Sequence, residues 1–273
     1  MLTTDMITVI IILCVLLLLF ALWLFVLIRP SGKAVKNTAL LCDYAHRGLH
    51  GSVPENSLAA FDLAVKEGYG IELDVQLSRD GKVMVFHDYT LNRMTGVDNK
   101  LRQLDCSDLQ TLSLLNTDQA IPTFSQVLSL IDGKVPLLIE LKGVSLDTSL
   151  CEKVAELLKD YRGAYCIESF NPLLIGKIKK YLPDAFYGLL YTNVCRDKKK
   201  YSPLNIVVTC MALNFLARPD FIAYNQYDRN SLPVRLTTKF YRAPRFVWTV
   251  KTEKDLSLTH SLGEYPIFER GMG

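Results

Sequence analysis

Eight short apolar runs of the kind that form buried β-strands recur along this chain, and helical patterns lie between most of them. The runs cover residues 41–45, 71–77, 137–141, 165–169, 186–190, 221–224, 246–250 and 266–268. Alternating strands and helices indicate βα units, and eight units in roughly 230 residues are the count and size of a TIM barrel. A doubly wound sheet would need fewer strands. We therefore expect an α/β chain folded as a TIM (β/α)8 barrel.

Helical stripes and one hairpin complete the predicted barrel. The first helix is expected after the cap-like pair Asn56-Ser57. The clearest stripes consist of Leu58, Phe61 and Val65, of Leu150, Val154, Leu157 and Leu158, and of Leu173, Leu174, Ile178 and Tyr181. Residues 82–87 predict an extra strand that pairs back on 75–78. Residues 90–122 lack a clear strand pattern, so we expect a short insertion after the second strand, over the barrel mouth.

The N-terminal part of the chain is apolar. Residues 7–28 carry no charge, and at about 1.5 Å per residue they span the roughly 30 Å hydrocarbon core of a bilayer. A cleaved signal peptide would have a shorter apolar core and a small-x-small cleavage site, and neither is evident. We therefore expect one retained transmembrane helix over 7–28, a linker over 29–39 and the barrel over 40–273.

Charge and cysteine usage give the expected location. Arg29, Lys33 and Lys36 follow the apolar run, while no Lys or Arg precedes it, so the positive-inside rule places the barrel in the cytoplasm. Seven cysteines without a CxxC motif fit reduced thiols. A net charge of +3 is too mild to indicate a nucleic-acid partner. We expect a single-pass protein of the cell membrane, with a cytoplasmic catalytic domain.

Three acidic residues lie where a barrel has its active site, along strands that open at one mouth. Glu72 and Asp74 are two apart in one predicted strand, so both point to the same face, and Glu140 ends the next predicted strand. Buried acids need a counter-charge, and oxygen ligands favour a hard cation. The spacing therefore predicts a site for one divalent cation, Ca²⁺ or Mg²⁺.

Basic residues and histidines converge on the same mouth. His46 and Arg47 end the first strand, His87 ends the hairpin, and Lys142 lies two residues after Glu140. The guanidinium of Arg47 matches phosphate oxygens, and two histidines can act as acid and base near neutral pH. A cation, an arginine and paired histidines together predict phosphodiester hydrolysis.

The ordered motifs resemble those of glycerophosphodiester phosphodiesterases. The resemblance is dense over residues 44–142, and the matching motifs are His46-Arg47-Gly48, Pro54-Glu55-Asn56, Glu72-Leu73-Asp74-Val75, His87-Asp88, Leu91, Arg93 and Thr95, Ile121-Pro122-Thr123, Glu140-Leu141-Lys142, Ser169-Phe170 and Val247-Trp248-Thr249. It implies a TIM barrel that hydrolyses glycerophosphodiesters, with a divalent metal held by Glu72, Asp74 and Glu140. It further implies His46 and His87 as acid and base, Arg47 and Lys142 as phosphate ligands, and Trp248 against the glycerol.

Two departures and several open readings remain. Lys251 stands where many members have Asn, and Phe268-Glu269-Arg270 stands where many have Thr-Asp-x-Pro after the eighth strand, which puts the C-terminal rim and the substrate choice in question. Glu55 and Asn56 either support the site or begin a helix, and Trp248 is either a substrate contact or barrel packing. Lys142 is either a phosphate ligand or only a partner of Glu140. Glu168 is either a fourth acid at the mouth or a surface acid at a strand end, and we favour the surface acid.

Two functional hypotheses follow, the first with a variant. The first is a membrane-tethered hydrolase that releases glycerol 3-phosphate and an alcohol from a small glycerophosphodiester. A variant takes lysophospholipids at the bilayer surface, as a lysophospholipase D would. The alternative is a pseudoenzyme whose barrel binds lipid head groups or a protein partner, which the atypical rim favours and the intact acids and histidines oppose.

Overall fold

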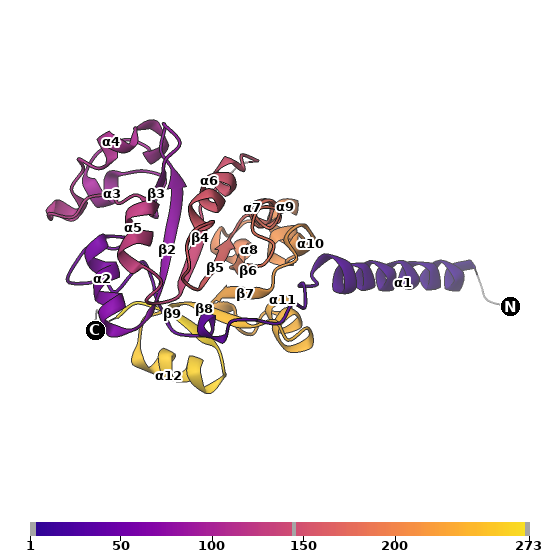
Figure 1. Cartoon of the computed structure of the whole chain (residues 1–273). Helices are drawn as coiled ribbons and strands as arrows, with labels where there is room; N and C mark the ends of the chain where they lie inside the picture. Colours follow the sequence, from indigo (N-terminus) through magenta and orange to yellow (C-terminus); the bar gives the residue numbers. More distant parts are fainter. Residues whose placement is uncertain (1–3, 144–145, 271–273) are drawn as a thin grey trace.

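A closed barrel of eight parallel strands forms the body of the computed structural model, which describes residues 4–143 and 146–270 (Figure 1). The barrel strands are β1 (Tyr44–Ala45), β2 (Gly70–Leu77), β4 (Leu137–Leu141), β5 (Tyr165–Ser169), β6 (Phe186–Tyr191), β7 (Phe221–Asn225), β8 (Arg245–Val250) and β9 (Tyr265–Phe268). They pair in this order around the ring, and β9 pairs with β1 to close it. The predicted TIM barrel is confirmed.

The first strand is shorter than predicted. Residues 41–43 do not pair, because the chain reaches the barrel through a 3₁₀ turn, η2 (Thr38–Leu40). Asn37 caps that turn, since its side-chain oxygen accepts a hydrogen bond from the Ala39 N–H at 3.0 Å. Leu40 and Leu41 then pack with the cluster inside the barrel, so only Tyr44 and Ala45 join the sheet.

The barrel interior is apolar at the N-terminal ends of the strands and charged at the other. Aromatic rings fill the lower part, where Phe221 lies between Phe186 and Phe246 with ring centroids 5.1 and 4.4 Å away. Gly188 makes room for them, because a Cβ there would come within 2.1 Å of the Phe221 ring. Above this plug, the inward positions of β2, β4 and β5 carry acids, so the chemistry is confined to the C-terminal mouth.

Helices pack around the outside of the sheet through most of the predicted stripe residues, but Leu173 and Tyr181 are exposed. Ser57 caps the first of them, since its Oγ accepts from the Ala60 N–H at 3.1 Å. The helices outside the insertion are α2 (Leu58–Glu67), α5 (Phe124–Ile131), α6 (Ser149–Leu158), α7 (Pro172–Ile178), α8 (Val194–Asp197), α9 (Pro203–Thr209), α10 (Asn214–Ala217), η5 (Gln226–Asp228), α11 (Leu232–Arg235), η6 (Leu236–Phe240) and α12 (Glu253–Ser261).

The expected hairpin and insertion follow β2. Strand β3 (Val83–Val85) pairs antiparallel with β2, with Val85 opposite Val75. The insertion beyond it contains α3 (Asn92–Thr95), η3 (Leu101–Gln103), α4 (Cys106–Leu109) and η4 (Leu114–Asn116). These short turns share their own buried cluster, which includes Phe86, Leu91 and Leu101. The insertion is thus a small packed lobe at the end of the hairpin (Figure 1).

Within residues 4–143 and 146–270, one helix is long and apolar enough to cross a membrane. It runs from Thr4 to Leu27 as α1 (Thr4–Leu22) and a π-helical turn, η1 (Trp23–Leu27), and it extends away from the barrel beside α10 and α11 (Figure 1). Its last turn docks on the barrel. Trp23 Nε1 donates to Cys210 O at 2.9 Å, Tyr241 Oη donates to Leu24 O at 2.7 Å, and Ile28 is fully buried.

The segment after this helix lies along the barrel rather than free in solvent. The Ser31 N–H donates to Pro219 O at 2.8 Å, just before β7. Lys33 Nζ donates to Ala185 O at 2.9 Å, just before β6. Both contacts lie at the N-terminal ends of strands, opposite the charged mouth.

Candidate active site

Three buried acids meet at the mouth of the barrel. Glu72 and Asp74 point inward from β2, and Glu140 comes from β4, where it stands directly opposite Asp74. Each offers a carboxylate oxygen, and these oxygens lie within 4.8 Å of one another. The outward residues that alternate with the acids of β2, Ile71 and Leu73, pack under the helices. The alternation predicted from the sequence therefore gathers all three acids at one point.

The charges of these acids show that the cluster suits a cation. Burial raises the pKa of Glu72 well above its ordinary value, and Asp74 and Glu140 raise it further. Burial also raises the pKa of Glu140 to about 7, against the opposing effect of Lys142. Burial works against ionisation of Asp74 too, but Lys142 and Arg47 outweigh it and hold its pKa below the usual range. A divalent cation would favour all three ionised carboxylates, which are its preferred ligands.

Two cationic side chains border the acids. Arg47 Nε lies 3.6 Å from Asp74 Oδ2, and the Arg47 backbone N–H donates to Glu72 Oε2 at 2.9 Å. Lys142 Nζ lies 2.7 Å from Glu140 Oε1 and 3.0 Å from Asp74 Oδ1. Burial opposes the charge of Lys142, but the two acids outweigh it and raise its pKa. Lys142 is therefore an ion-pair partner that also faces the cleft.

A left-handed turn after β1 places Arg47 over the acids. Arg47 and Gly48 have φ angles of 56° and 79°. A Cβ on Gly48 would come within 2.9 Å of Ala60 and Phe61 in α2, so this turn requires glycine. The motif His46-Arg47-Gly48 thus combines a positive φ with close packing against a helix.

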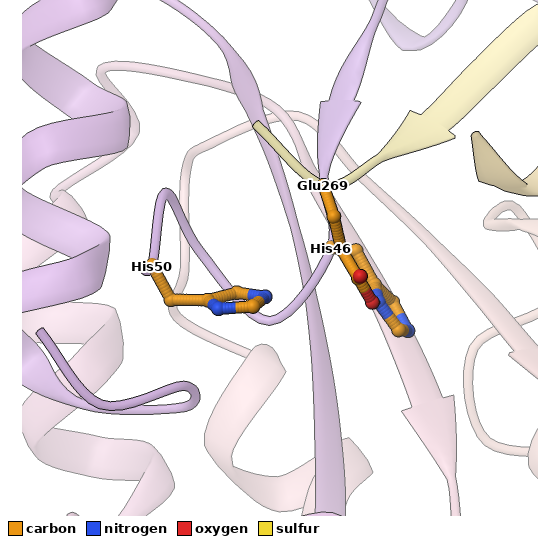
Figure 2. Close-up of side chains that lie close together, drawn as sticks. All are labelled: His46, His50 and Glu269. Carbon is orange, nitrogen blue, oxygen red and sulfur yellow. The ribbon is translucent and has the colours of Figure 1, made fainter. Parts of the chain in front are cut away.

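His46 is held by the C-terminal rim. Its Nδ1–H donates to Glu269 Oε1 at 2.8 Å (Figure 2). Lys251 Nζ lies 2.9 Å from the other carboxylate oxygen. The hydrogen bond from His46, aided by Lys251, lowers the pKa of Glu269 to about 2. His50 lies beside the pair, with donor atoms of the three residues within 4.8 Å (Figure 2). The two departures noted in the sequence, Lys251 and Glu269, are therefore paired with each other and with a histidine.

His87 is held in the same way from the other side. Its Nδ1–H donates to Asp88 Oδ1 at 2.6 Å, and Arg93 Nε donates to Asp88 Oδ2 at 2.6 Å. Arg93 Nη2 also donates to Glu55 Oε1, which accepts from Arg47 Nη1 at 2.8 Å. Burial lowers the pKa of both His46 and His87, and the carboxylate on each Nδ1 leaves Nε2 as the ring nitrogen without that partner.

The structure places Glu55 and Asn56 in support of the site. Glu55 joins the two arginines described above, and Asn56 is 1% exposed. Asn56 Nδ2 donates to Asp74 Oδ2 at 2.8 Å, and its φ of 52° is one that Asn tolerates better than most residues. Ser57, not Asn56, caps the helix.

The sequence prediction for Glu168 is wrong. Glu168 is not a surface acid but is 1% exposed, and it lines the same cleft as Glu72 and Glu140. It points inward because it stands opposite Glu140 in the next strand. Burial raises its pKa well above the ordinary value, and its Oε2 has no hydrogen-bond partner. The site therefore has a fourth buried acid.

Two clefts meet over these residues. The one over the acids has a volume of about 90 Å³, and Trp248 lines it. A larger one of about 430 Å³ opens over Tyr89 and Ser169, and it shares His87 and Phe170 with the first. Trp248 packs edge to face with Phe170, with centroids 5.7 Å apart, and donates through Nε1 to Ala223 O. It both packs in the barrel and borders the cleft.

A comparison with known protein families shows which family has this arrangement of residues. The profile of the Glycerophosphoryl diester phosphodiesterase family matches residues 46–268. The chain belongs to this family. Membership supports glycerophosphodiester phosphodiesterase activity, so the chain is a phosphoric diester hydrolase. The family binds a divalent metal, and the cluster of Glu72, Asp74 and Glu140 is a group that could hold one.

Individual family members agree with this assignment. The Bacillus subtilis protein YhdW is 28% identical over 248 residues, 82% of this chain and 94% of that protein. The glycerophosphodiester phosphodiesterase of Caldanaerobacter subterraneus subsp. tengcongensis is 37% identical over 158 residues, 54% of this chain and 65% of that protein.

Solved structures of phosphodiesterases share the barrel. The glycerophosphodiester phosphodiesterase of Thermotoga maritima superimposes with a TM-score of 0.65 at 27% identity, covering 83% of this chain and 94% of that one. An Oleispira antarctica phosphodiesterase, solved with the product sn-glycerol-3-phosphate, gives 0.69 at 22% identity, covering 84% and 92%.

Proposed function

We propose that the chain hydrolyses glycerophosphodiesters to glycerol 3-phosphate and an alcohol, in a reaction that needs one divalent cation. The observation that carries the proposal is the convergence of three buried acids, two cations and two histidines on one mouth. Glu72, Asp74 and Glu140 would hold the cation, either Ca²⁺ or Mg²⁺. When bound, it would supply charge that stabilises the phosphoryl oxygens and acidifies a coordinated hydroxyl.

The protein's own side chains would bind the phosphate and move the protons. Arg47 and Lys142 would neutralise the phosphoryl oxygens, and Trp248 would lie against the glycerol. One of His46 and His87 would take the proton of the attacking water or glycerol hydroxyl. The other would give a proton to the leaving alcohol, because an alkoxide is a poor leaving group. Glu269 and Asp88 would keep each ring oriented with Nε2 toward the substrate.

We further propose that the helix Thr4–Leu27 anchors the enzyme in the cell membrane as a single span, with the barrel in the cytoplasm. The support is the length and hydropathy of the helix and the positive charges that follow it. Cys151 and Cys195 are buried and would not report orientation. An impermeant thiol reagent on an introduced Ser261→Cys, in intact cells, should leave that cysteine unlabelled; labelling would place the barrel outside.

The deciding experiment measures turnover of glycerophosphocholine and glycerophosphoglycerol by the full chain in detergent. We expect turnover with Ca²⁺ or Mg²⁺ and none in EDTA. Glu72→Gln should lose turnover while keeping the far-UV circular dichroism of the wild type. Glu156→Gln, on the exposed side of α6, is the matched control and should behave like the wild type.

Full turnover in EDTA would overturn the metal requirement. Absence of turnover with every added cation, together with binding of the same substrates, would favour the pseudoenzyme that binds lipid head groups or a protein partner. The four acids and paired histidines argue against that alternative, because a site that only binds has no use for an oriented proton acceptor and an oriented proton donor.

A further inference from the structure

Two histidines and one carboxylate lie close together at the rim of the mouth, apart from the cluster of three acids. His46 and His50 come from the turn and loop after β1, and Glu269 follows β9. One donor atom from each residue lies within 4.8 Å of the other two. Figure 2 shows the ring of His50 directed toward the other two side chains. Closure of the barrel brings the three together, because β1 pairs with β9.

His50 has a buried ring nitrogen without a partner. Its Nε2 makes no hydrogen bond to any residue that the structure describes. The backbone holds the loop in place, since the Leu49 N–H donates to Ala60 O at 3.0 Å and the His50 N–H donates to Gly48 O at 3.0 Å. A buried polar atom that is left unpaired costs free energy. The position of this nitrogen beside two other donor atoms therefore points to a ligand that all three would share.

The donor atoms distinguish this cluster from the three acids. Glu72, Asp74 and Glu140 offer only carboxylate oxygens, which suit the hard cations Ca²⁺ and Mg²⁺. Two imidazoles and one carboxylate suit a borderline cation instead, and zinc uses this set of ligands with a fourth position open. The two clusters at this mouth therefore favour different cations.

Only a small rearrangement separates the present geometry from a zinc site. Ligand atoms of a tetrahedral zinc lie about 3.4 Å apart, at zinc–ligand distances of about 2.0–2.2 Å. His46 Nδ1 and Glu269 Oε1 are 2.8 Å apart and would separate slightly, while His50 Nε2 would move toward them. Lys251, which pairs with the other oxygen of Glu269, is 62% exposed and can turn into solvent.

We propose that His46, His50 and Glu269 bind a zinc ion that inhibits the enzyme. The inhibition rests on the proposed function, because it acts through the role given there to His46. Zinc on Nδ1 requires the single proton of the neutral ring to move to Nε2, the nitrogen that lies 3.9 Å from Glu72. Nε2 could then accept no further proton, and it would release the one it holds less readily than an imidazolium does. Either role of His46 would be lost.

The test titrates zinc into the full chain in detergent. The cation that supports turnover is kept in large excess, so that it occupies the three acids. A chromogenic chelator competes for zinc and reports its affinity, while glycerophosphocholine turnover is followed in a parallel titration. We expect one zinc per chain and a loss of turnover with the same midpoint. His50→Gln should weaken zinc binding and inhibition by more than about tenfold, and zinc-free turnover should stay at the wild-type value.

Two further variants make the test specific. His260→Gln is the matched control, because His260 is an exposed histidine of α12 that pairs with Asp43, before β1. It should bind zinc as the wild type does. Lys251→Gln removes the competing cation beside Glu269 and should tighten zinc binding. Unchanged zinc affinity and inhibition in His50→Gln would overturn the inference, since zinc would then act elsewhere. If His50→Gln does not fold, unchanged or weaker zinc binding by Lys251→Gln would overturn it.

Cobalt(II) reports the site without turnover, because its visible absorption depends on the number and type of its ligands. In the same excess of the activating cation, we expect a visible band that saturates at one cobalt per chain. Zinc should abolish this band, and His50→Gln should not show it. A wild type without the band, and without tight zinc binding, would overturn the metal site. The band in a chain that hydrolyses no glycerophosphodiester with any cation would instead overturn the proposed function.

Discussion

His46 and His87 reach the mouth from opposite supports but are oriented by the same device, a carboxylate on Nδ1. Two rings held in this way fit a displacement in which one proton is removed and another is delivered. We predict that His46→Ala and His87→Ala each lower turnover by about 10²–10⁴. With a nitrophenyl ester, whose leaving group needs no proton, activity should recover only in the variant that lacks the acid.

The comparison of the two esters is the check on this prediction. If both variants were equally impaired on the natural and the nitrophenyl ester, the histidines would not divide the proton transfers. One of them would then be better described as a phosphate ligand.

Glu269 should contribute stability that depends on pH. Its pKa is lowered from 4.5 to about 2 by the hydrogen bond from His46, so the ionised form stabilises the fold above about pH 4.5. This contribution disappears as the pH falls from about 4.5 toward 2. Glu269→Gln should therefore cost on the order of 2 kcal/mol at pH 7, or a Tm lower by about 4–8 °C.

Thermal unfolding of wild type and Glu269→Gln between pH 7 and pH 3 tests this, and the Tm gap should narrow as the pH falls. Lys254→Gln, at an exposed residue of α12 that forms no ion pair with any residue the structure describes, serves as control and should show no such trend. A constant gap across the range would contradict the prediction.

The sequence is informative about residues whose spacing is local. The acids two apart in a strand, and the glycine beside Arg47, follow from strand alternation and motif spacing. The bond between His46 and Glu269 could not be predicted, because it joins residues 223 apart. The opposite charges of Lys251 and Glu269, the two atypical positions, were the one sequence feature that could have indicated a contact at this rim. The prediction for Glu168 was wrong because the sequence of one strand does not reveal its register against the neighbouring strand, and this register places Glu168 opposite Glu140.

At the scale of elements, the insertion after β3 supports His87 and Arg93. Its cluster is separate from the main core, so damage there should affect the site more than the barrel. We predict that Leu101→Ala, at a fully buried position, costs about 2–5 kcal/mol and lowers turnover more than tenfold. Leu158→Ala, equally buried in α6, should cost similar stability and leave kcat within threefold.

The Tm of each variant measures the loss of stability. The kcat of each variant, measured at a temperature below its unfolding transition, measures the loss of turnover. Equal losses of kcat in both variants would show that the insertion does not position His87. The insertion was predicted only because residues 90–122 lack a strand pattern. Its helical turns of three or four residues are too short to show the 3.6-residue hydrophobic periodicity of a helix.

At the scale of the whole molecule, the N-terminal helix is docked and not a loose tether. Ile28 is buried, and Ser31 Oγ donates to the buried carboxylate of Asp220. The segment predicted from sequence as a linker therefore also belongs to the fold of the barrel. The sequence could not reveal this docking, because residues 29–39 show neither helical nor strand hydrophobic periodicity.

A truncation series should reveal this docking. We predict that a chain of residues 37–273 is less stable than one of residues 23–273 by on the order of 3 kcal/mol, with a Tm lower by about 6–12 °C. Loss of the buried Ile28 side chain is the main reason. Differential scanning fluorimetry in the same detergent would measure the shift, and equal Tm values would mean that the segment adds nothing to the barrel.

The contact between His46 and Glu269 has a consequence during protein synthesis. It joins the ends of the first and last barrel strands, so the ribosome must make 223 further residues after His46 before the pair can form. At 5–20 residues per second, this takes roughly 10 to 45 s. Throughout that time the apolar helix is already available to the translocation machinery, while the nascent barrel still lacks the partner that orients its first histidine. Insertion would thus precede the onset of catalysis.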